Sequence, residues 1–491
     1  MPNRPNVLVV YSDQHRADCL GSYGNTEIRT PALDALASGG TVFENCFCSY
    51  PVCTPSRYSF LSGLPVWRHA GWTNHCTLSP DFETFPKIMR RAGYRTAAVG
   101  KMHFTPTYLD VGFERMTLCE QDGPGRWDDD YHRELMGRDM IDLVDLADQR
   151  GEYRTRQRDE YWNTWGAQES DLAEEFHSTT WVGRRALEEI ERWDEGGNLL
   201  MVGFVKPHHP FDPPAPWSTM YDPVALSLLP GWTEASLERD VAFNKGYFPH
   251  ERLTSEAARL ATAMYYGAIS QIDHWCGKVF DALKARGLYD DALVIYTGDH
   301  GEYMGFHHMM LKGNRMYDPL MRVPLVVKRP GQSGASRSEG LVSCTDMAPT
   351  ILAAAGCERA TSMEGLDLAA AAAGHDMVFG EDRRGSGVMV RTRSRKLLHR
   401  KDEDLLFDLA EDPFELVDVS GDASYADDLA RLREAATSWR DADALPETYL
   451  DEHAPRISGD NVPEVDDDHR QRISAWYARK ADATGALKPQ A

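Results

Sequence analysis

The sequence predicts an α/β protein with a large, mainly parallel central sheet and a small C-terminal α+β domain that has an antiparallel sheet. Apolar runs rich in β-branched residues recur along most of the chain, as expected of strands that are buried on both faces. Segments with helical spacing separate these runs, which favours helices on both sides of a parallel sheet. After about residue 375, short strand-like runs with intervening turn residues replace that alternation.

The expected elements follow one another in chain order. The strand-like runs are NVLVVYS (6–12), RTAAVG (95–100), NLLMVGFV (198–205), ALVIYTG (292–298) and VPLVVK (323–328). The helix-like segments span 30–40, 83–93, 170–193 and 255–287. The first helix is expected to begin with Thr30 as its N-cap and Pro31 at its first position, and to end on glycines. Because reactive groups gather at the carboxyl ends of the strands in such sheets, the residues after each strand are the candidates for a site.

We predict three parts of the chain. A large α/β domain over 1–375 would carry the catalytic groups, and a small α+β subdomain would follow over 376–445. In the subdomain, strand-like runs precede a segment with helical spacing at 425–442. The remaining residues, 446–491, are polar, contain prolines and include the run EVDDDHR, which indicates an extended arm.

Composition and charge exclude several classes of protein. Apolar residues at 42% and charged residues at 26% are typical of a soluble globular protein. The formal charge of −23 argues against nucleic acid as a partner, although a few cations in a cleft can still hold an anionic substrate. No window approaches the roughly 20 apolar residues of a membrane span. Nine cysteines without a CxxC pair fit reduced thiols, so we expect a cytoplasmic protein without membrane contact.

Polar side chains follow two of the predicted strands at the point where each strand ends. The first strand runs into Asp13 and Gln14, and the strand at 292–298 runs into Asp299 and His300. Carboxylate and amide oxygens together with an imidazole suit a divalent cation. A single Asp at a strand end is more often a turn former or a helix cap. The presence of both pairs, together with the basic residues described next, predicts a metal site.

Lysines and histidines also gather after the predicted strands. They are Lys101 and His103 after the strand at 95–100, Lys206, His208 and His209 after the strand at 198–205, and His307, His308 and Lys312 beyond His300. A single His or Lys in a loop is usually solvated, but several strand ends that carry them point to one shared site. The pattern predicts a site for a tetrahedral oxyanion, where a metal and lysines neutralise charge and histidines move protons.

Residues 53–57 read CTPSR, and this stretch resembles the CxPSR signature of type I sulfatases, whose cysteine a maturation enzyme oxidises to formylglycine. Other stretches resemble family motifs in the same order, namely NVLVVYSDQ, TPALDALASGG, GYRTAAVGKMH, VKPHHPF, YTGDHGEYMG and LFDLAEDPFELVDV. The ordered combination of CxPSR, GKxH and DHG is highly specific. The resemblance implies an alkaline-phosphatase-like α/β sandwich and a sulfatase that hydrolyses an organic sulfate ester to an alcohol and inorganic sulfate.

The resemblance also implies roles for individual residues. Formylglycine made from Cys53 would be hydrated to a geminal diol, and one hydroxyl would attack sulfur to give a covalent sulfated intermediate. His103 would deprotonate the second hydroxyl, so that the aldehyde re-forms and sulfate leaves. The other catalytic residues would be Arg57, Lys101 and Lys312, which stabilise charge, and His208 with Lys312, which protonate the leaving oxygen.

The implied metal ligands are Asp13, Gln14, Asp299, His300 and the residue derived from Cys53. Gln14 and His300 stand where many family members have Asp and Asn, which places the chain near choline sulfatases and phosphonate monoester hydrolases. Hard Ca²⁺ prefers oxygen ligands whereas imidazole suits Mn²⁺, so we expect Ca²⁺, with Mn²⁺ as the alternative. Asn74 matches a substrate-side Asn of that branch, and we predict that Asn74 and His307 contact the substrate.

Two other functions stay open. A phosphonate monoester hydrolase or phosphodiesterase is the main alternative, but that group replaces the Lys and His of GKxH, which this chain retains as Lys101 and His103. A non-catalytic anion or glycan binder would require Cys53 to remain a thiol. The expected partners are a small-molecule or saccharide sulfate ester and the formylglycine-generating enzyme. We also expect a homo-oligomer in which Trp476 and Tyr477 of the arm reach a neighbouring subunit.

Overall fold

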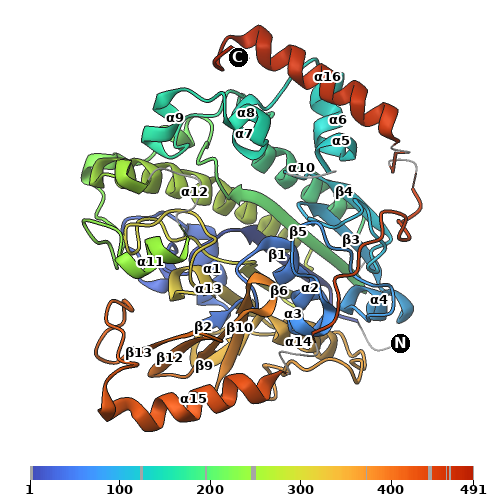
Figure 1. Cartoon of the computed structure of the whole chain (residues 1–491). Coiled ribbons are helices and arrows are strands. Elements are labelled where there is room, and N and C mark those ends of the chain that lie inside the picture. Colours follow the sequence, from blue (N-terminus) through green and yellow to red (C-terminus); the bar gives the residue numbers. More distant parts are fainter. Residues whose placement is uncertain are drawn as a thin grey trace.

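A computed structural model describes residues 4–121, 125–193, 196–244, 250–371, 373–440, 445–459, 462–463 and 466–489. Within these residues, nine strands form a central sheet that has helices on both faces (Figure 1). Its strands run in the order β4 (Arg115–Leu118), β3 (Arg95–Gly100), β5 (Asn198–Pro207), β1 (Val7–Asp13), β6 (Leu293–Gly298), β8 (Leu325–Lys328), β2 (Thr41–Phe47) and β7 (Arg322–Val323), with β9 (Ser336–Ser343) paired to β2.

The prediction of a mainly parallel sheet is confirmed. β1 pairs in parallel with both β5 and β6, and β3 pairs in parallel with β4 and β5. The run at 323–328, expected as one strand, is instead divided into β7 and β8 at Pro324, which has no backbone N–H to donate to a ladder. Both pieces run antiparallel to their neighbours.

The two faces of β1 enter different hydrophobic cores. Val7, Val9 and Tyr11 belong to one core, together with residues of α2 (Cys53–Ser62), α4 (Phe85–Arg91) and α14 (Met347–Ala354). Leu8 and Val10 belong to the other core, with residues of α1 (Pro31–Ser38), α10 (Ser178–Glu191) and α12 (Ser255–Ala285). Burial on both faces explains the continuous apolar run. It also places Asp13 at the carboxyl edge of the sheet, between two packed layers.

The start of α1 differs from the expectation. Pro31 is at the first turn as predicted, but the side chain of Thr30 does not cap the helix. Instead, Asp273 of α12 accepts hydrogen bonds from the backbone N–H groups of Ala32 (3.2 Å) and Leu33 (2.8 Å). A carboxylate from a distant helix therefore satisfies the donors that a local cap would otherwise serve.

Short helices occupy the region between β4 and α10, where the sequence indicated no element before residue 170. They are α5 (Gly125–Asp128), α6 (Asp130–Gly137), α7 (Leu143–Gln149), α8 (Gly151–Arg154) and α9 (Asp159–Thr164). Elsewhere the structure adds α3 (Val66–His69), α11 (Glu238–Phe243) and α13 (Asp318–Met321). None of the helices that the structure describes has the length and apolar character needed to cross a membrane.

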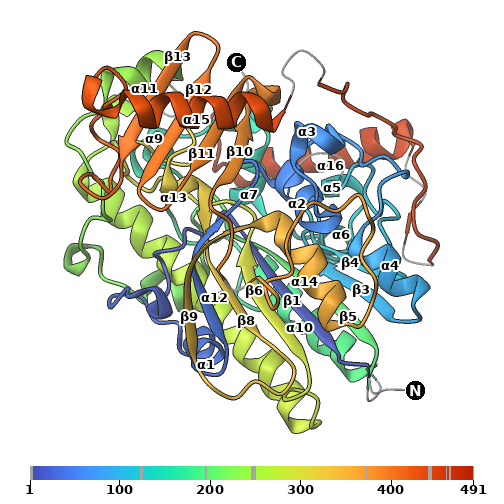
Figure 2. The same ribbon diagram turned by 90° about the horizontal axis from the view of Figure 1, so that it is seen from below.

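A second sheet follows the large one, and it is antiparallel as predicted. It consists of β10 (Val378–Asp382), β11 (Gly387–Arg391), β12 (Arg395–Arg400) and β13 (Glu403–Asp408). α15 (Ala426–Trp439) packs against it (Figure 2), with Leu432 and Ala436 buried against Val390 and Leu406. These elements lie inside the stretch 376–445, and the division of the chain into domains stays a prediction.

The last part of the chain contains a helix where an extended arm was expected. The backbone N–H of Thr77 donates to the carbonyl of Tyr449 (3.1 Å), which holds the arm beside the large domain. α16 (Asp467–Thr484) then lies at the opposite end of the molecule from α15, beside α5, α6 and α8 (Figure 1). Its buried residues, Ile473, Tyr477 and Ala481, recur every four positions. Such a narrow apolar stripe in a polar segment is a weak sequence signal.

These buried residues of α16 form one hydrophobic cluster with α7. The cluster includes Leu143, Leu146 and Ala147 of α7, and Tyr477 is only 2% exposed. Tyr477 also donates a hydrogen bond to the carbonyl of Arg126 (3.2 Å). In this structure Tyr477 is therefore used within its own chain, and the homo-oligomer stays a prediction.

We expect the substitution Ile473→Ala to loosen α16 and α7 together, because it opens a space in the cluster that joins them. Removing such a buried side chain costs about 2–5 kcal/mol. Hydrogen exchange should therefore become faster in both 467–484 and 143–149. The exposed neighbour Gln471→Ala is the matched control and should change neither segment. Faster exchange in α16 alone would contradict the coupling.

Candidate active site

The residues predicted from the strand ends converge around Cys53, the first residue of α2. Its Sγ lies 3.6 Å from Asp13 Oδ1, 3.4 Å from His300 Nε2 and 3.4 Å from Lys312 Nζ. Ligand atoms of Asp13, Cys53, Asp299 and His300 all lie within 4.8 Å of one another, and these four residues are buried. Segments from distant parts of the sequence therefore form one cluster of reactive groups.

Arg57 links the two carboxylates of this cluster. Its Nη2 lies 3.0 Å from Asp13 Oδ2, and its Nε lies 3.0 Å from Asp299 Oδ2. Its Nη1 donates to the carbonyl of Lys101. Arg57 is one helical turn after Cys53, so α2 delivers both the candidate nucleophile and the cation that neutralises its neighbours. Two buried carboxylates that share one arginine need its positive charge, because unpaired buried charges are very costly.

Two lysines reach the cluster from different loops. Lys101 Nζ lies 2.9 Å from Asp13 Oδ2 and 3.0 Å from Gln121 Oε1. Lys312 Nζ lies 2.9 Å from His208 Nε2. His208 Nδ1 is in contact with the backbone carbonyl of His209, so Nδ1 donates there and Nε2 faces Lys312 as an acceptor. Lys312 and His208 thus form a pair that can share one proton.

The charges of the cluster shift the pKa values of its members. Although burial opposes it, Lys312 and Lys101 hold the pKa of the Cys53 thiol well below its usual range. Burial and the charge of Lys312 lower the pKa of His208 to about 4. Burial and the Asp13 carboxylate raise the pKa of Asp299 to about 6. The site therefore favours a negative charge at the position of Sγ, where a reaction with an anionic ester group would need cations.

Gln14 and His300 are oriented as ligands of a cation would be. Gln14 Nε2 donates to Glu302 and lies 3.3 Å from His209 Nδ1. Its Oε1 is buried and has no hydrogen-bond partner within the described part of the chain. His300 Nδ1 lies 2.9 Å from the carbonyl of Gly301, so its Nε2 faces Cys53 and Lys312 Nζ, the latter at 3.2 Å.

A buried amide oxygen without a donor costs about 1–3 kcal/mol, and a cation would remove that cost. The side chains around the cluster are carboxylates, an amide oxygen and an imidazole, which is a donor set for a divalent ion. The residues present therefore fit a divalent metal site formed by Asp13, Gln14, Cys53, Asp299 and His300.

His103 and Asn74 lie close to the start of α2. The hydroxyl of Thr54 donates to the carbonyl of His103 (2.8 Å), and Asn74 Oδ1 accepts a hydrogen bond from the backbone N–H of Thr54 (3.1 Å). Glu120 accepts hydrogen bonds from the backbone N–H of His103. His103 Nδ1 is buried and unbonded among the described residues. Both residues contact Thr54, which directly follows Cys53, and their catalytic and substrate roles stay predictions.

His307 lies away from the cluster. Its Nδ1 is 3.3 Å from Asp240 Oδ2, its Nε2 is 2.7 Å from the carbonyl of Phe414, and its ring stacks on Phe306. Its Nε2 therefore engages the C-terminal part of the chain, and its Nδ1 engages α11. The contacts give no support to the expected substrate role of His307. Lys206, another strand-end candidate, is likewise held by Asp212.

Several supporting residues were not predicted. They are Glu120, Gln121, Asp145, Asp148 and Glu302. Gln121 Nε2 donates to Asp145 Oδ1 of α7 (3.0 Å), which connects Lys101 to that helix. Glu302 stands in the stretch GDHGEYMG, so its place in that motif is a usable signal. Gln121 and Asp145 stand in a region without a motif, where the sequence gives no comparable signal.

Comparisons with known proteins identify the family of this chain. Residues 5–357 match the family described as Sulfatase, and residues 305–442 match the C-terminal region of N-sulphoglucosamine sulphohydrolase. An arylsulfatase of Clostridium perfringens (strain 13 / Type A) is 30% identical over 466 residues, which cover 88% of this chain and 93% of the relative. The multifunctional alkaline phosphatase superfamily protein PehA of Trinickia caryophylli is 28% identical, over 89% of this chain and 95% of that protein.

Among solved structures, the phosphonate monoester hydrolase of Agrobacterium radiobacter has a TM-score of 0.74 at 25% identity, covering 89% of this chain and 95% of that one. The fold and the strand-end site define a hydrolase of the alkaline phosphatase superfamily. The family match extends over most of the chain, and this protein belongs to the sulfatase family. It is a sulfuric ester hydrolase, and the predicted fold class is confirmed.

We expect Glu302→Gln to weaken metal binding by about 10- to 100-fold, as is typical for partners of metal ligands. The new amide would donate to Gln14, so the Gln14 amide would turn and present its NH₂ group to the metal in place of Oε1. Isothermal titration with Ca²⁺ and with Mn²⁺ measures the effect. The control is Glu381→Gln, another fully buried glutamate, which lies outside the cluster. Unchanged metal affinity in Glu302→Gln would show that Gln14 is not a ligand.

Proposed function

We propose that this sulfatase uses formylglycine, made from Cys53 by a formylglycine-generating enzyme, to hydrolyse an organic sulfate ester. The observation that supports this most strongly is the position of Cys53. It stands in the CTPSR stretch at the start of α2, with Lys312 and His300 within 3.4 Å of its Sγ. The hydrate of formylglycine supplies one hydroxyl that attacks sulfur and a second whose deprotonation releases sulfate.

The metal in this proposal is Ca²⁺, with Mn²⁺ as the alternative. Asp13, Gln14, Asp299, His300 and the residue made from Cys53 would hold it. When bound, it neutralises charge on the sulfate group and favours attack on sulfur. The buried Oε1 of Gln14, which lacks a donor in the described part of the chain, supports a hard oxygen-binding ion. The imidazole of His300 supports the alternative.

Protein side chains would handle the remaining charges and protons. Lys101, held by Asp13 and Gln121, would offset charge on the non-bridging oxygens. Lys312 and His208 would deliver a proton to the leaving oxygen, since their nitrogens are 2.9 Å apart and Lys312 also reaches Cys53. His103 would accept the proton of the second hydroxyl. Its buried Nδ1, which has no hydrogen-bond partner among the described residues, supports that role.

The substrate class is a small-molecule or saccharide sulfate ester. A phosphonate monoester is the second candidate, because the A. radiobacter hydrolase shares the fold at 25% identity. Retention of Lys101 and His103 favours sulfate. We also propose that the protein works in a reducing compartment such as the cytoplasm, because all nine cysteines, which lie in the described residues, are free.

The modification of Cys53 is tested by mass spectrometry after carbonyl trapping. In protein from a host that has the maturation enzyme, the peptide with residues 53–57 should react with a hydrazide, and Cys53→Ala should abolish turnover. An unmodified thiol in active protein would contradict the proposal. The same preparation should hydrolyse aryl sulfates faster than a phenyl phosphonate monoester. The reverse order with a trapped aldehyde would keep the nucleophile and change the substrate class.

Lys312→Ala should lower kcat by about 10²- to 10⁴-fold on an alkyl sulfate, because the alkoxide then leaves without a proton donor. On a nitrophenyl sulfate, whose leaving group needs little protonation, the loss should be much smaller. Lys284→Ala on the exposed end of α12 is the control and should leave both rates unchanged. Equal losses on both substrates would show that Lys312 stabilises charge and does not assist the leaving group.

A further inference from the structure

A second cationic region lies apart from the group around Cys53. It is a cavity of about 310 Å³, located where the loop after β1 meets β7, the end of β11 and the loop after β13. Its lining shares no residue with the Cys53 cluster. The lining includes four arginines from distant parts of the sequence, Arg16, Arg322, Arg391 and Arg393. The tertiary fold therefore concentrates positive charge here in a chain whose formal charge is −23.

The two carboxylates that line this cavity are already bound by other groups. Asp18 accepts hydrogen bonds from Nε and Nη2 of Arg16, at 2.7 and 2.9 Å. Asp318 Oδ1 lies 2.7 Å from Lys396 Nζ, and Asp318 Oδ2 lies 3.3 Å from Arg391 Nη2. Both carboxylates are therefore already hydrogen-bonded or ion-paired to other cations, although each also lies close enough to Arg322 for that arginine to help lower its pKa.

Arg322 and Arg393 are the other two arginines of the lining. Within the described residues, their side chains make no hydrogen bond and no ion pair. A guanidinium group has several N–H donors in a planar fork that matches two oxygens of a sulfate or phosphate group. Two such groups on one cavity repel each other until an anion lies between them. Among the described residues, the cavity therefore offers an anion two guanidinium groups whose N–H donors are unbonded, while its two carboxylates are bonded to Arg16, Arg391 and Lys396.

The rest of the lining is largely apolar. It includes Phe306, which is buried and stacks on His307 with ring centroids 4.1 Å apart. It also includes Phe414, which is 40% exposed, and three prolines. Such surfaces pack against the face of a sugar or an aromatic ring. Arginines beside ring surfaces are suited to an organic anion better than to a bare inorganic ion.

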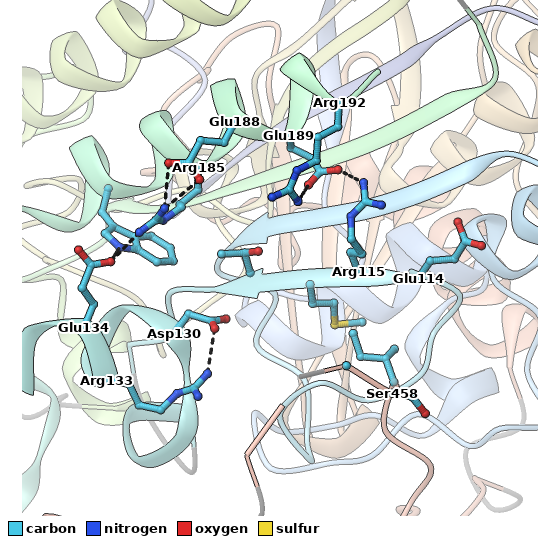
Figure 3. A pocket seen from close by; sticks show the side chains of 15 residues that line it. Glu114, Arg115, Asp130, Arg133, Glu134, Arg185, Glu188, Glu189, Arg192 and Ser458 are labelled. Atoms are coloured by element: carbon cyan, nitrogen blue, oxygen red, sulfur yellow. Dashed lines mark hydrogen bonds and ion pairs between the residues drawn. The ribbon is translucent and has the colours of Figure 1, made fainter. Parts of the chain in front are cut away.

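A larger cavity shows the opposite pattern (Figure 3). It has a volume of about 700 Å³ and lies beside the edge strand β4, between α6, α10 and the arm. Each of its arginines is paired with a carboxylate, as in Arg115–Glu189, Arg133–Asp130, Arg185–Glu134 and Arg192–Glu189. Because every arginine that lines this cavity is paired with a carboxylate, none needs an anionic ligand. This cavity therefore serves as the comparison for the cavity at Arg322 and Arg393.

We propose that the cavity at Arg322 and Arg393 binds an organic anion that is not the ester being hydrolysed. A sulfate or phosphate group lies between the two guanidinium groups, and the ring that carries it packs against Phe306 and Phe414. Binding is non-covalent and independent of the Cys53 cluster. A bare inorganic anion, such as the sulfate released by the enzyme, shares the charge contacts but lacks the ring contacts.

The site can be located by X-ray crystallography. Crystals of the full, metal-loaded chain are soaked in selenate or in benzenesulfonate. Benzenesulfonate has a C–S bond that an ester hydrolase does not cleave. We expect anomalous density for selenium or sulfur between Arg322 and Arg393. In solution, isothermal titration should give binding of benzenesulfonate about tenfold tighter than that of selenate. The absence of density in this cavity, at concentrations that fill the active site, would overturn the proposal.

Variants separate the contribution of the arginines to binding from that of the aromatic ring. Arg322→Ala and Arg393→Ala should each weaken benzenesulfonate binding at this site by about tenfold or more, because each removes a charge-assisted contact. Phe414→Ala should reduce the affinity to that for selenate. Arg393 and Phe414 are exposed, so these two variants should fold even if Arg322→Ala does not. Arg192→Ala, in the cavity with paired charges, is the control and should bind normally. Unchanged binding in Arg393→Ala, or equal affinity for selenate and benzenesulfonate, would contradict the proposed ligand.

Discussion

The bridge from Arg57 to Asp13 and Asp299 is the interaction on which the site depends. It joins the carboxyl ends of β1 and β6 to the first turns of α2, where Cys53 begins the helix. Without the guanidinium group, two carboxylates would face each other in a region from which water is excluded. With the guanidinium group in place, the two carboxylates can lie close together and still have negative charge available to bind a cation. The geometry of the candidate nucleophile and that of the candidate metal site therefore have a common origin.

The chemistry of the site depends on which polar atoms of Gln14 and His300 are already hydrogen-bonded to neighbouring residues. Glu302 and His209 engage the nitrogen of the Gln14 amide, which leaves the oxygen without a partner among the described residues. The carbonyl of Gly301 engages Nδ1 of His300, so that Nε2 faces Cys53. Each of these two candidate ligands is thus oriented by a neighbour that does not itself reach the cluster. This explains how neutral side chains can replace carboxylates at a site for a cation.

The C-terminal part of the chain supports the site from a distance. Lys101 contacts Gln121, Gln121 contacts Asp145 of α7, and α7 packs against α16. On the other side, the carbonyl of Phe414 holds His307, in the same loop that carries Lys312. The described residues in the last quarter of the sequence therefore contribute nothing to the Cys53 cluster, yet they pack against segments that do. The arginine-lined cavity lies at this second junction.

The sequence by itself determined the parallel sheet, the strand ends and the motif that carries Cys53, because these depend on local periodicity and on the geometry of strand ends. Asp13, Lys101 and His208 were found in this way. Tertiary structure alone decided which basic residues face the centre, and it turned His307 toward Asp240 instead. It also decided that α16 forms. The physical reason is that these outcomes depend on contacts between residues far apart in the chain, which no local pattern records.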